Sequence, residues 1–563
     1  MISSLVLGAV GATLLSPAFP AAVGLPFPAA LGLTANVTDP LSHGVLGDAR
    51  LSLDEAIRLC NGTLAMWQLS PAEAANVTGA GSVVDHVLID PMVTLSIQLE
   101  GPLTPITGQG LGPVHIEGIV IPAPGHGITT ILLGGSHAHI FALHTNAVTV
   151  SGLHLSGGQV GFDVRTSQGG YAEALMGRID ECDMHTQTVA SVRLTGIGLD
   201  HSTVMLHHCV FHNSARAILV QDQSSGGFVV MHAMHCHFDG VALACETTES
   251  GAGGAMSMVM FDRSEFDLGA NFVRVRRIGT GDQQLMLRLV HCDVTTTGDA
   301  VDVQGSANGL TMIHHHHSSL AAGPGQMALV VGPKTAEFDI HGSEMEFTGN
   351  VLLRGNLFTQ RVWQQNSTYL GGLLTFDVDG SLPNLLWNRY QNCQIVVPST
   401  GRTAVRVRSC ELVSSTVTGQ SLLAPVTLEG CWRSATTMAG QVTETGAVAG
   451  RFLSACSVTP AEVSLGAAFD LDTDAPAGVG VFWLLSLAID QPNTTQEPFR
   501  FYGDPLTAQT LFLTFGQSTV SLTVPNDPAF LDYEFYLAPV AFSTLAYGPE
   551  LTLPRGGRMQ PVE

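Results

Sequence analysis

A short phrase centred on a cysteine recurs through the middle of the chain at a nearly constant interval. Its five copies are Glu181-Cys182-Asp183-Met184, His208-Cys209-Val210-Phe211, His235-Cys236-His237-Phe238, Arg263-Ser264-Glu265-Phe266 and His291-Cys292-Asp293-Val294. The cysteine, or the serine that replaces it, returns every 27 or 28 residues, and an apolar run such as 217–220 or 272–275 follows each copy. A fixed period of this size is typical of stacked structural units, each of which buries its apolar face only against its neighbours.

The composition favours stacked strands over stacked helices. Apolar residues make up 45% of the chain and charged residues only 12%, so long amphipathic helices with charged outer faces are disfavoured. Outside the five copies, apolar and polar residues alternate over strand lengths in five further segments: 311–331, 338–354, 385–397, 404–417 and 425–432. The length of 563 residues predicts two or three folding units.

The charge balance restricts the partners. Lysine and arginine total 23 against 47 acidic residues, which gives a formal net charge of −24. Nucleic-acid binding rests largely on basic side chains that neutralise phosphates, so a nucleic-acid partner is excluded and cations are the favoured small partners. The ten cysteines include no CxxC pair, and they predict neither a disulfide scaffold nor a structural zinc site.

A short amphipathic helix is predicted near the start of the β-rich region. Ser52 precedes it as the N-cap and Glu55 is its third residue, an arrangement that forms a capping box. Leu53, Ala56, Ile57 and Leu59 make the apolar face, which ends at Gly62. Stacked repeats need atypical terminal units, so we expect this helix to cover an open end of the stack.

Residues 51–57 resemble the SLREAI-type segment that begins many secreted bacterial right-handed parallel β-helix proteins. Asp54 stands where that motif usually has arginine, and Leu51 where it often has cysteine. The segments that follow, 87–90, 93–99, 102–107 and 112–118, are also similar to the first coils of that family. The resemblance implies a pectin-lyase-like fold and export, and it implies no particular reaction.

These observations predict a mainly β protein: a right-handed parallel β-helix solenoid with a short N-terminal capping helix and a C-terminal antiparallel β-sandwich. We expect a signal peptide and linker over 1–30, the cap over 31–80, the β-helix over 81–457 and the sandwich over 458–563. Coils of roughly 25 residues would give about 15 rungs and, at about 4.8 Å per rung, a shaft about 70 Å long.

The two ends of the chain predict a signal peptide and a C-terminal β-sandwich. Residues 5–33 lack charges but contain four prolines, so they disfavour a membrane-spanning helix, and 5–15 has the length of a signal-peptide apolar region with Ala21 and Ala22 near a cleavage site. A wrongly placed start and an ordered apolar strand stay open as alternatives, because no basic residue precedes this segment. After Cys456 the period disappears, and strand-like segments separated by turns predict the sandwich, which is similar to C-terminal modules of secreted bacterial proteins.

The repeated phrase supplies the candidate metal ligands. If the cysteines point inward as free thiols, the residues on either side should point outward, because strand side chains alternate. One outward column would contain Glu181, His208, His235, Arg263, His291 and His314, and the other Asp183, Val210, His237, Glu265, Asp293 and His316.

Histidines one rung apart beside a carboxylate can hold zinc, nickel or copper. The candidates are His208, His235, His237, His291, His314 and His316. The alternative is an ordinary polar outer face, in which Arg263 would repel a cation and the run 314–317 would capture metals only incidentally.

A polysaccharide lyase or glycosidase has to be weighed as well. A lyase would acidify a sugar proton with calcium-bound carboxylates and remove it with a basic residue. Arg274 and Arg276 share one strand face, Asp299 and Asp302 lie about one coil later, and Arg276 is the first candidate for the base because Lys334 is the only lysine. The alternative is that these charges decorate a solvated face.

Two short matches to polygalacturonase-like hydrolases do not make a glycosidase. Gly125-His126-Gly127 resembles their histidine motif, and 297–302 resembles their paired-carboxylate segment. The histidine motif precedes the carboxylates here instead of following them, and Ala300 stands where a second aspartate is expected. We interpret both matches as chance.

Three functions follow as hypotheses. The first is an exported, non-catalytic surface or extracellular protein for adhesion or glycan binding, whose partner is an extracellular polysaccharide or a cell-surface component. The second is a lyase or glycosidase acting on the outer face of the shaft, and the third is an extracellular metal-binding protein. The sequence assigns no definite cofactor: Ca²⁺ belongs to the second hypothesis and a transition metal to the third.

Overall fold

The computed structural model describes most of the chain from residue 32 onward. The described residues are 32–43, 46–79, 84–107, 113–121, 129–165, 176–198, 201–224, 226–250, 256–277, 284–304, 310–316, 318–322, 327–331, 337–343, 346–357, 363–365, 367–380, 384–386, 388–408, 410–445, 456–459, 462–474, 480–486, 509–515, 517–527, 535–543, 550–552 and 557–562. The expected signal peptide, the Gly125-His126-Gly127 match and His317 lie outside them.

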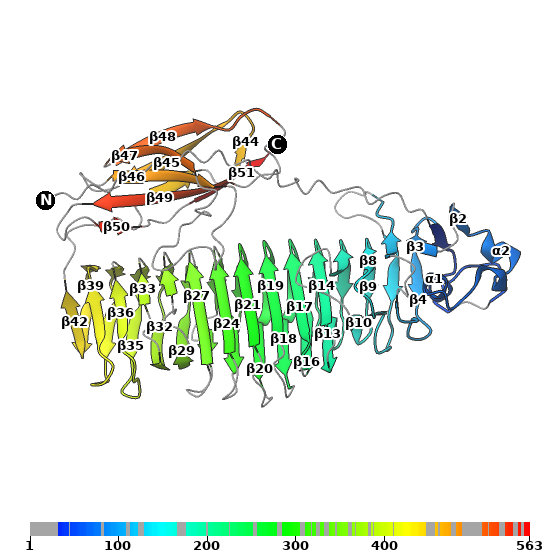
Figure 1. Ribbon diagram of the computed structural model, residues 1–563, viewed down its shortest axis with the longest axis horizontal. Coiled ribbons are helices and arrows are strands. Elements are labelled where there is room, and N and C mark those ends of the chain that lie inside the picture. Colours follow the sequence, from blue (N-terminus) through cyan, green and yellow to red (C-terminus); the bar gives the residue numbers. More distant parts are fainter. Residues whose placement is uncertain are drawn as a thin grey trace.

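Successive coils of the shaft each contribute a strand to three ladders of parallel strands (Figure 1). The first ladder runs from β1 (Leu33–Val37) and β3 (Val84–Ile89) through β8 (Val148–Ser151), β11 (Gly177–Asp180), β14 (His201–His207), β17 (Phe228–Met234), β19 (Met256–Asp262), β21 (Gln284–Val290) and β24 (Leu310–His316) to β42 (Val442–Thr445). The second contains β4 (Ser96–Gln98), β6 (Ile131–Leu133), β9 (His154–Ser156), β12 (Asp183–His185), β15 (Val210–His212), the beginnings of β18 (His237–Glu249) and β20 (Glu265–Arg277), β22 (Asp293–Thr296), β25 (Ser319–Ala321) and, at its end, β40 (Trp432–Ser434). The third contains β7 (Phe141–Leu143), β10 (Val160–Val164), β13 (Ala190–Gly198), β16 (Ile218–Ser224), the ends of β18 and β20, β23 (Val301–Gln304), β26 (Met327–Val331) and, at its end, β41 (Thr437–Gly440).

The chain therefore folds as a right-handed parallel β-helix, which confirms the predicted fold class. Parallel strands in register bring equivalent residues of successive coils directly above one another, as in the pairing of Met184 with Phe211 and of Phe211 with Phe238. The repeated phrase of the sequence thus becomes a set of columns along the shaft.

The repeated cysteines form one inward column. Cys182, Cys209, Cys236 and Cys292 are at most 2% exposed and make no disulfide, as predicted. Burial raises the pKa of the Cys182 and Cys292 thiols to about 12, so these thiols stay protonated at neutral pH. The column is continuous where serine replaces cysteine, because the Ser264 hydroxyl accepts a hydrogen bond from the Cys236 backbone N–H at 3.2 Å.

A column of aromatic rings lies next to the cysteines. The rings of Phe211, Phe238 and Phe266 stack with centroid separations of 4.6 and 4.4 Å, and each side chain is at most 4% exposed. Contacts of this kind between coils are the main source of cohesion in a solenoid, since each coil packs only against its neighbours.

The predicted helix is present as α1 (Leu53–Cys60) at the N-terminal end of the shaft (Figure 1). The Ser52 hydroxyl accepts a hydrogen bond from the Glu55 N–H at 3.2 Å, and the Glu55 carboxylate accepts one from the Ser52 N–H at 2.9 Å, which completes the capping box. The Asn61 side chain donates to the Pro105 carbonyl at 2.7 Å and fixes the helix to the next coil. Two short helical segments, η1 (Met66–Gln68) and α2 (Pro71–Ala74), follow α1.

The C-terminal strands form two sheets that lie beside the shaft in Figure 1. One sheet is antiparallel and contains β43 (Cys456–Thr459), β45 (Ala468–Asp474) and β48 (Gln517–Thr523); the other contains β44 (Glu462–Ser464), β46 (Gly480–Ser486), β47 (Gln509–Phe515), β49 (Phe535–Ser543), β50 (Glu550–Thr552) and β51 (Gly557–Val562). Leu471 of the first sheet and Trp483 and Leu537 of the second belong to one buried apolar cluster. The assignment as a β-sandwich and the domain boundaries stay predictions. Among the described residues, no helix has the length and apolar character needed to span a membrane.

Candidate functional site

The residue before each repeated cysteine lies at a bend, not within a strand. Glu181, His208, His235, Arg263 and His291 have φ angles between 46° and 52°, in the left-handed region that L-residues seldom adopt. Each of them joins a strand of the first ladder to a strand of the second. The expectation that strand alternation alone orients both neighbours of the cysteine is therefore wrong for this side.

The residue after each cysteine does lie in a strand, as expected. Asp183 pairs with Val210, Val210 with His237, His237 with Glu265 and Glu265 with Asp293 along the second ladder. Asp293 in turn pairs with Ser319. Ser318, the residue before it, accepts a hydrogen bond from the Cys292 N–H and therefore continues the cysteine column.

His314 and His316 do not belong to these columns. They lie in β24 of the first ladder, opposite Arg288 and Val290. The prediction failed because His314 and His316 flank position 315, which would need a coil of 23 residues after Cys292. At this column the coil is 26 residues long and ends on the inward Ser318 instead of a cysteine. His314 and His315 are both buried, with exposures of 8% and 2%.

The structure brings together only part of the predicted histidine set. The rings of His208 and His235 stack with their centroids 5.0 Å apart, and the ring of His207 lies edge-on to that of His208 at 4.2 Å. Burial, together with the neighbouring His208, lowers the pKa of His207. His237 instead pairs with Glu265, at 3.4 Å between Nδ1 and Oε2.

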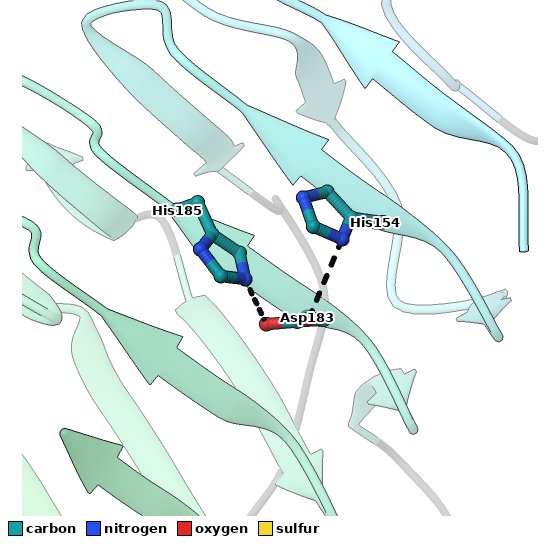
Figure 2. Close-up of side chains that lie close together, drawn as sticks. All are labelled: His154, Asp183 and His185. Carbon is teal, nitrogen blue, oxygen red and sulfur yellow. Dashed lines mark ion pairs between the residues drawn. The ribbon is translucent and has the colours of Figure 1, made fainter. Parts of the chain in front are cut away.

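Two histidines that the sequence interpretation missed form a closer cluster with Asp183 (Figure 2). Oδ2 of Asp183 lies 3.4 Å from His154 Nδ1, and Oδ1 of Asp183 lies 2.8 Å from His185 Nε2. His154 is the partner of Asp183 on the preceding coil, and His185 lies two residues beyond Asp183 on the same face of β12. Within the described part of the chain, these residues are the one group of three or more potential metal ligands whose nitrogen and oxygen atoms all lie within 4.8 Å of one another.

The cluster continues along the second ladder. The ring of His185 stacks on that of His154 and on that of His212, at 4.4 Å between centroids in both cases. His212 Nδ1 donates a hydrogen bond to Asp239 Oδ2 at 3.0 Å, and His212 Nε2 lies 3.7 Å from Asp183 Oδ1. Three imidazoles and two carboxylates therefore occupy four adjacent coils.

Asp183 is the electrostatic centre of the cluster. Burial raises the pKa of its carboxyl, but contacts with the His154 and His185 imidazoles outweigh that effect and lower the pKa below the usual value. Oδ1 of Asp183 and Nε2 of His185 are shielded from solvent and face each other as an ion pair at 2.8 Å.

Three of the predicted catalytic residues, Arg274, Arg276 and Asp302, lie on the third ladder. NH2 of Arg276 is 2.6 Å from Asp302 Oδ2, and Nε of Arg274 is 3.7 Å from the same oxygen. Asp299 lies in the bend before β23, where its backbone N–H donates to the Asn271 side chain at 2.9 Å. The arginines thus form their ion pairs with Asp302.

Other ion pairs continue the same outer face. Arg193 donates two hydrogen bonds to Asp163, at 2.9 and 2.6 Å, and these bonds raise the pKa of Arg193. Arg216 contacts Glu246 at 2.5 Å. We call Asp163, Arg193, Arg216, Glu246, Arg274, Arg276 and Asp302 the arginine–carboxylate face.

The sequence carried a signal for the missed cluster. His185, His212 and Asp239 each lie three residues after a repeated cysteine, so they form a column of their own. The column prediction used only the residues directly before and after the cysteine. Strand alternation places the third residue after the cysteine on the same face as the first residue after it. His154 had no repeated cysteine beside it and could be found only through its register with Asp183.

No protein-family model and no curated protein sequence matches the chain. Three bacteriophage tailspikes are among the solved structures that match the chain. Gp49 of the Acinetobacter baumannii phage Fri1, a capsular polysaccharide depolymerase, has 10% sequence identity and a TM-score of 0.26, and the match covers 83% of this chain and 81% of gp49. The tailspike of Acinetobacter phage vB_ApiP_P1 has 10% identity and a TM-score of 0.18, with 84% of this chain and 73% of the tailspike covered. The enzymatically active domain of bacteriophage CBA120 tailspike protein 4 has 11% identity and a TM-score of 0.19, with 84% of this chain and 64% of that domain covered.

Proposed function

We propose that this protein is an exported, non-catalytic surface or extracellular protein that binds a polysaccharide along the arginine–carboxylate face. The observation that carries the proposal is the series of ion pairs Arg193–Asp163, Arg216–Glu246 and Arg276–Asp302 along the third ladder, where Arg216 lies just before strand β16. The apolar, proline-containing N-terminal segment supports export.

The spacing of this face suits an extended polymer. Register connects Asp163, Arg193, Leu219, Glu246, Arg274 and Asp302 on consecutive coils. Five steps of about 4.8 Å give a row about 24 Å long, which spans several sugar rings. A polymer that repeats along its axis can therefore meet the same kind of group several times.

The chemistry of the face suits hydroxyl groups. Guanidinium groups donate hydrogen bonds in a fixed fork and carboxylates accept them, so a paired row presents both partners that a sugar hydroxyl needs. The ion pairs also hold the side chains in place before a ligand arrives, which lowers the entropic cost of binding.

The same pairing argues against catalysis by the predicted base. Arg276 donates to Asp302 at 2.6 Å, and a nitrogen that donates its N–H to a carboxylate is not placed to accept a sugar proton. The Asp302 side chain is only 12% exposed beneath the two arginines, which limits its access to a calcium ion or a glycosidic oxygen. Cleavage of the bound polymer is the alternative that an experiment has to exclude.

Binding and cleavage are measured together on purified full-length protein, against acidic and neutral polysaccharides with and without Ca²⁺. Arg193→Ala should weaken binding about tenfold, because it removes two charge-assisted hydrogen-bond donors from the face. Arg433→Ala is the matched control: Arg433 forms a two-bond pair with Glu444 at 2.7 and 2.7 Å, and its side chain is 29% exposed against 28% for Arg193.

Two outcomes would overturn the proposal. Release of oligosaccharides by the unsubstituted protein would show an enzyme. Equal binding by the Arg193 and Arg433 variants would place the ligand elsewhere on the molecule.

A further inference from the structure

We propose that His154, Asp183 and His185 form a binding site for a divalent transition metal, with zinc as the reference ion. The inference is independent of polysaccharide binding, because the three residues belong to the second ladder and the arginine–carboxylate face belongs to the third. It also differs from the metal site expected from the sequence, whose candidate ligands were His208, His235, His237, His291, His314 and His316.

The donor set selects the class of metal. Two imidazole nitrogens and one carboxylate oxygen are typical ligands of zinc and of neighbouring transition metals, whereas Ca²⁺ and Mg²⁺ are bound almost entirely by oxygen. The three side chains are 24%, 36% and 27% exposed, so an ion can enter from solvent while the protein still shields one side of it.

The Asp183 oxygens lie near ligand-to-ligand distances from the two imidazoles, and one ligand atom from each residue lies within 4.8 Å of the others. Bonds of 2.0–2.1 Å to zinc place neighbouring ligand atoms about 3.4 Å apart. Here the separations from the Asp183 oxygens are 3.4 Å to His154 Nδ1 and 2.8 Å to His185 Nε2. Figure 2 shows each ring turning one nitrogen toward Asp183, so small rotations of the rings would direct both nitrogens at one ion.

The shielded atoms supply the second argument. Oδ1 of Asp183 and Nε2 of His185 form an ion pair at 2.8 Å, and both atoms are screened from solvent. An ion between the carboxylate and the two imidazoles would be held by two ligand atoms that water does not reach.

The surrounding residues leave one coordination position open. His212 is turned toward Asp239 by a 3.0 Å hydrogen bond, and its Nε2 stays 3.7 Å from Asp183 Oδ1. We therefore assign three protein ligands and a fourth position for water or an external ligand, the pattern of zinc sites that are not purely structural. Because the ligands come from two successive coils, β9 and β12, a bound ion would also connect these coils.

The test is a zinc titration of the full chain by calorimetry, with Co²⁺ absorption spectra as a second readout of ligand geometry. The unsubstituted protein should bind one zinc ion that is lost or weakened at least roughly tenfold in His154→Asn/His185→Asn. Zinc should also raise the melting temperature of the unsubstituted protein and leave that of the double variant unchanged, because an ion that binds only the folded state stabilises it.

His86→Asn is the matched control. His86 forms a single pair with Glu117 at 3.0 Å, and its side chain is 22% exposed, close to the value for His154. This variant should keep the zinc affinity and the tetrahedral Co²⁺ spectrum. Asp183→Asn, which preserves the shape of the side chain, should weaken zinc binding in a chain whose circular dichroism shows normal folding.

The histidine run 314–317 is unchanged in all these variants, so the difference between them reports the proposed site alone. Retention of the zinc affinity by the double variant would overturn the proposal. An equal loss of zinc affinity in the His86 variant would also overturn it, since the affinity would then not depend specifically on His154, Asp183 and His185.

Discussion

At the scale of single residues, the bends before the cysteines are the most constrained positions of the repeat. Glu181, His208 and His235 all take positive φ angles near 50°, although none of them is glycine or asparagine. The left-handed conformation costs an L-residue roughly 1–2 kcal/mol, so the fold accepts this cost at successive coils in order to turn from the first ladder to the second.

A substitution series at His208 measures this cost. Relative to His208→Ala, which removes the ring contact with His235, His208→Gly should be more stable by about 1 kcal/mol and His208→Val less stable by about 1–2 kcal/mol. Denaturant unfolding followed by circular dichroism gives the three free energies. Equal stabilities for alanine and glycine would contradict the argument from backbone strain.

At the scale of elements, the inward columns could be predicted from the sequence, and the bends before the cysteines could not. Alternation of apolar and polar residues identifies the inward side of each strand, which is why the cysteine column follows from the sequence. Whether a residue next to the cysteine lies in a strand or a bend depends on its φ angle, and His208 and Glu181 carry no glycine-like signal of that choice.

Coil length limited the prediction of the candidate site in the same way. The column prediction placed His314 and His316 beside position 315, which assumes a coil of 23 residues after Cys292. The coil is 26 residues long at this column, so both histidines fall in the preceding strand, β24. The pairing of His154 with Asp183 likewise depends on register between coils, which a period of 27 or 28 residues does not define before residue 182.

The stacked phenylalanines test how strongly the coils are coupled. Phe238→Ala should lower the free energy of unfolding by about 3–5 kcal/mol, because Phe238 loses contacts with both Phe211 and Phe266 and leaves a cavity. The outward residue His237 is the control, and His237→Ala should change stability by less than about 0.5 kcal/mol. Thermal or denaturant unfolding supplies the values, and a similar loss in both variants would argue against the inward column as the source of cohesion.

At the scale of the whole molecule, a solenoid has two ends at which strands lack a partner. Unpaired strand edges promote association with other chains, and α1 lies at the N-terminal end, where the Asp54 carboxylate accepts a hydrogen bond from the Thr104 N–H at 2.7 Å. Leu53 and Ile57 of α1 are fully buried and belong to the same apolar core as the shaft. The helix is thus both the end of the core and the cover of the first coils.

Removing this cover should change how the molecule associates. Ile57→Asp places a charge in the apolar contact between α1 and the shaft, so we expect α1 to detach and the exposed end to recruit other chains, with a rise in the mass measured by light scattering and a lower melting temperature. Trp67→Asp introduces the same charge in the same cap at a side chain that is 84% exposed, and it should leave both quantities unchanged. If Ile57→Asp keeps the mass of the unsubstituted protein while its melting temperature falls, α1 contributes stability without protecting the end. A solenoid that stays unassociated after losing its cap would have to be protected by its own strand edges, and the covering role of α1 would then be abandoned.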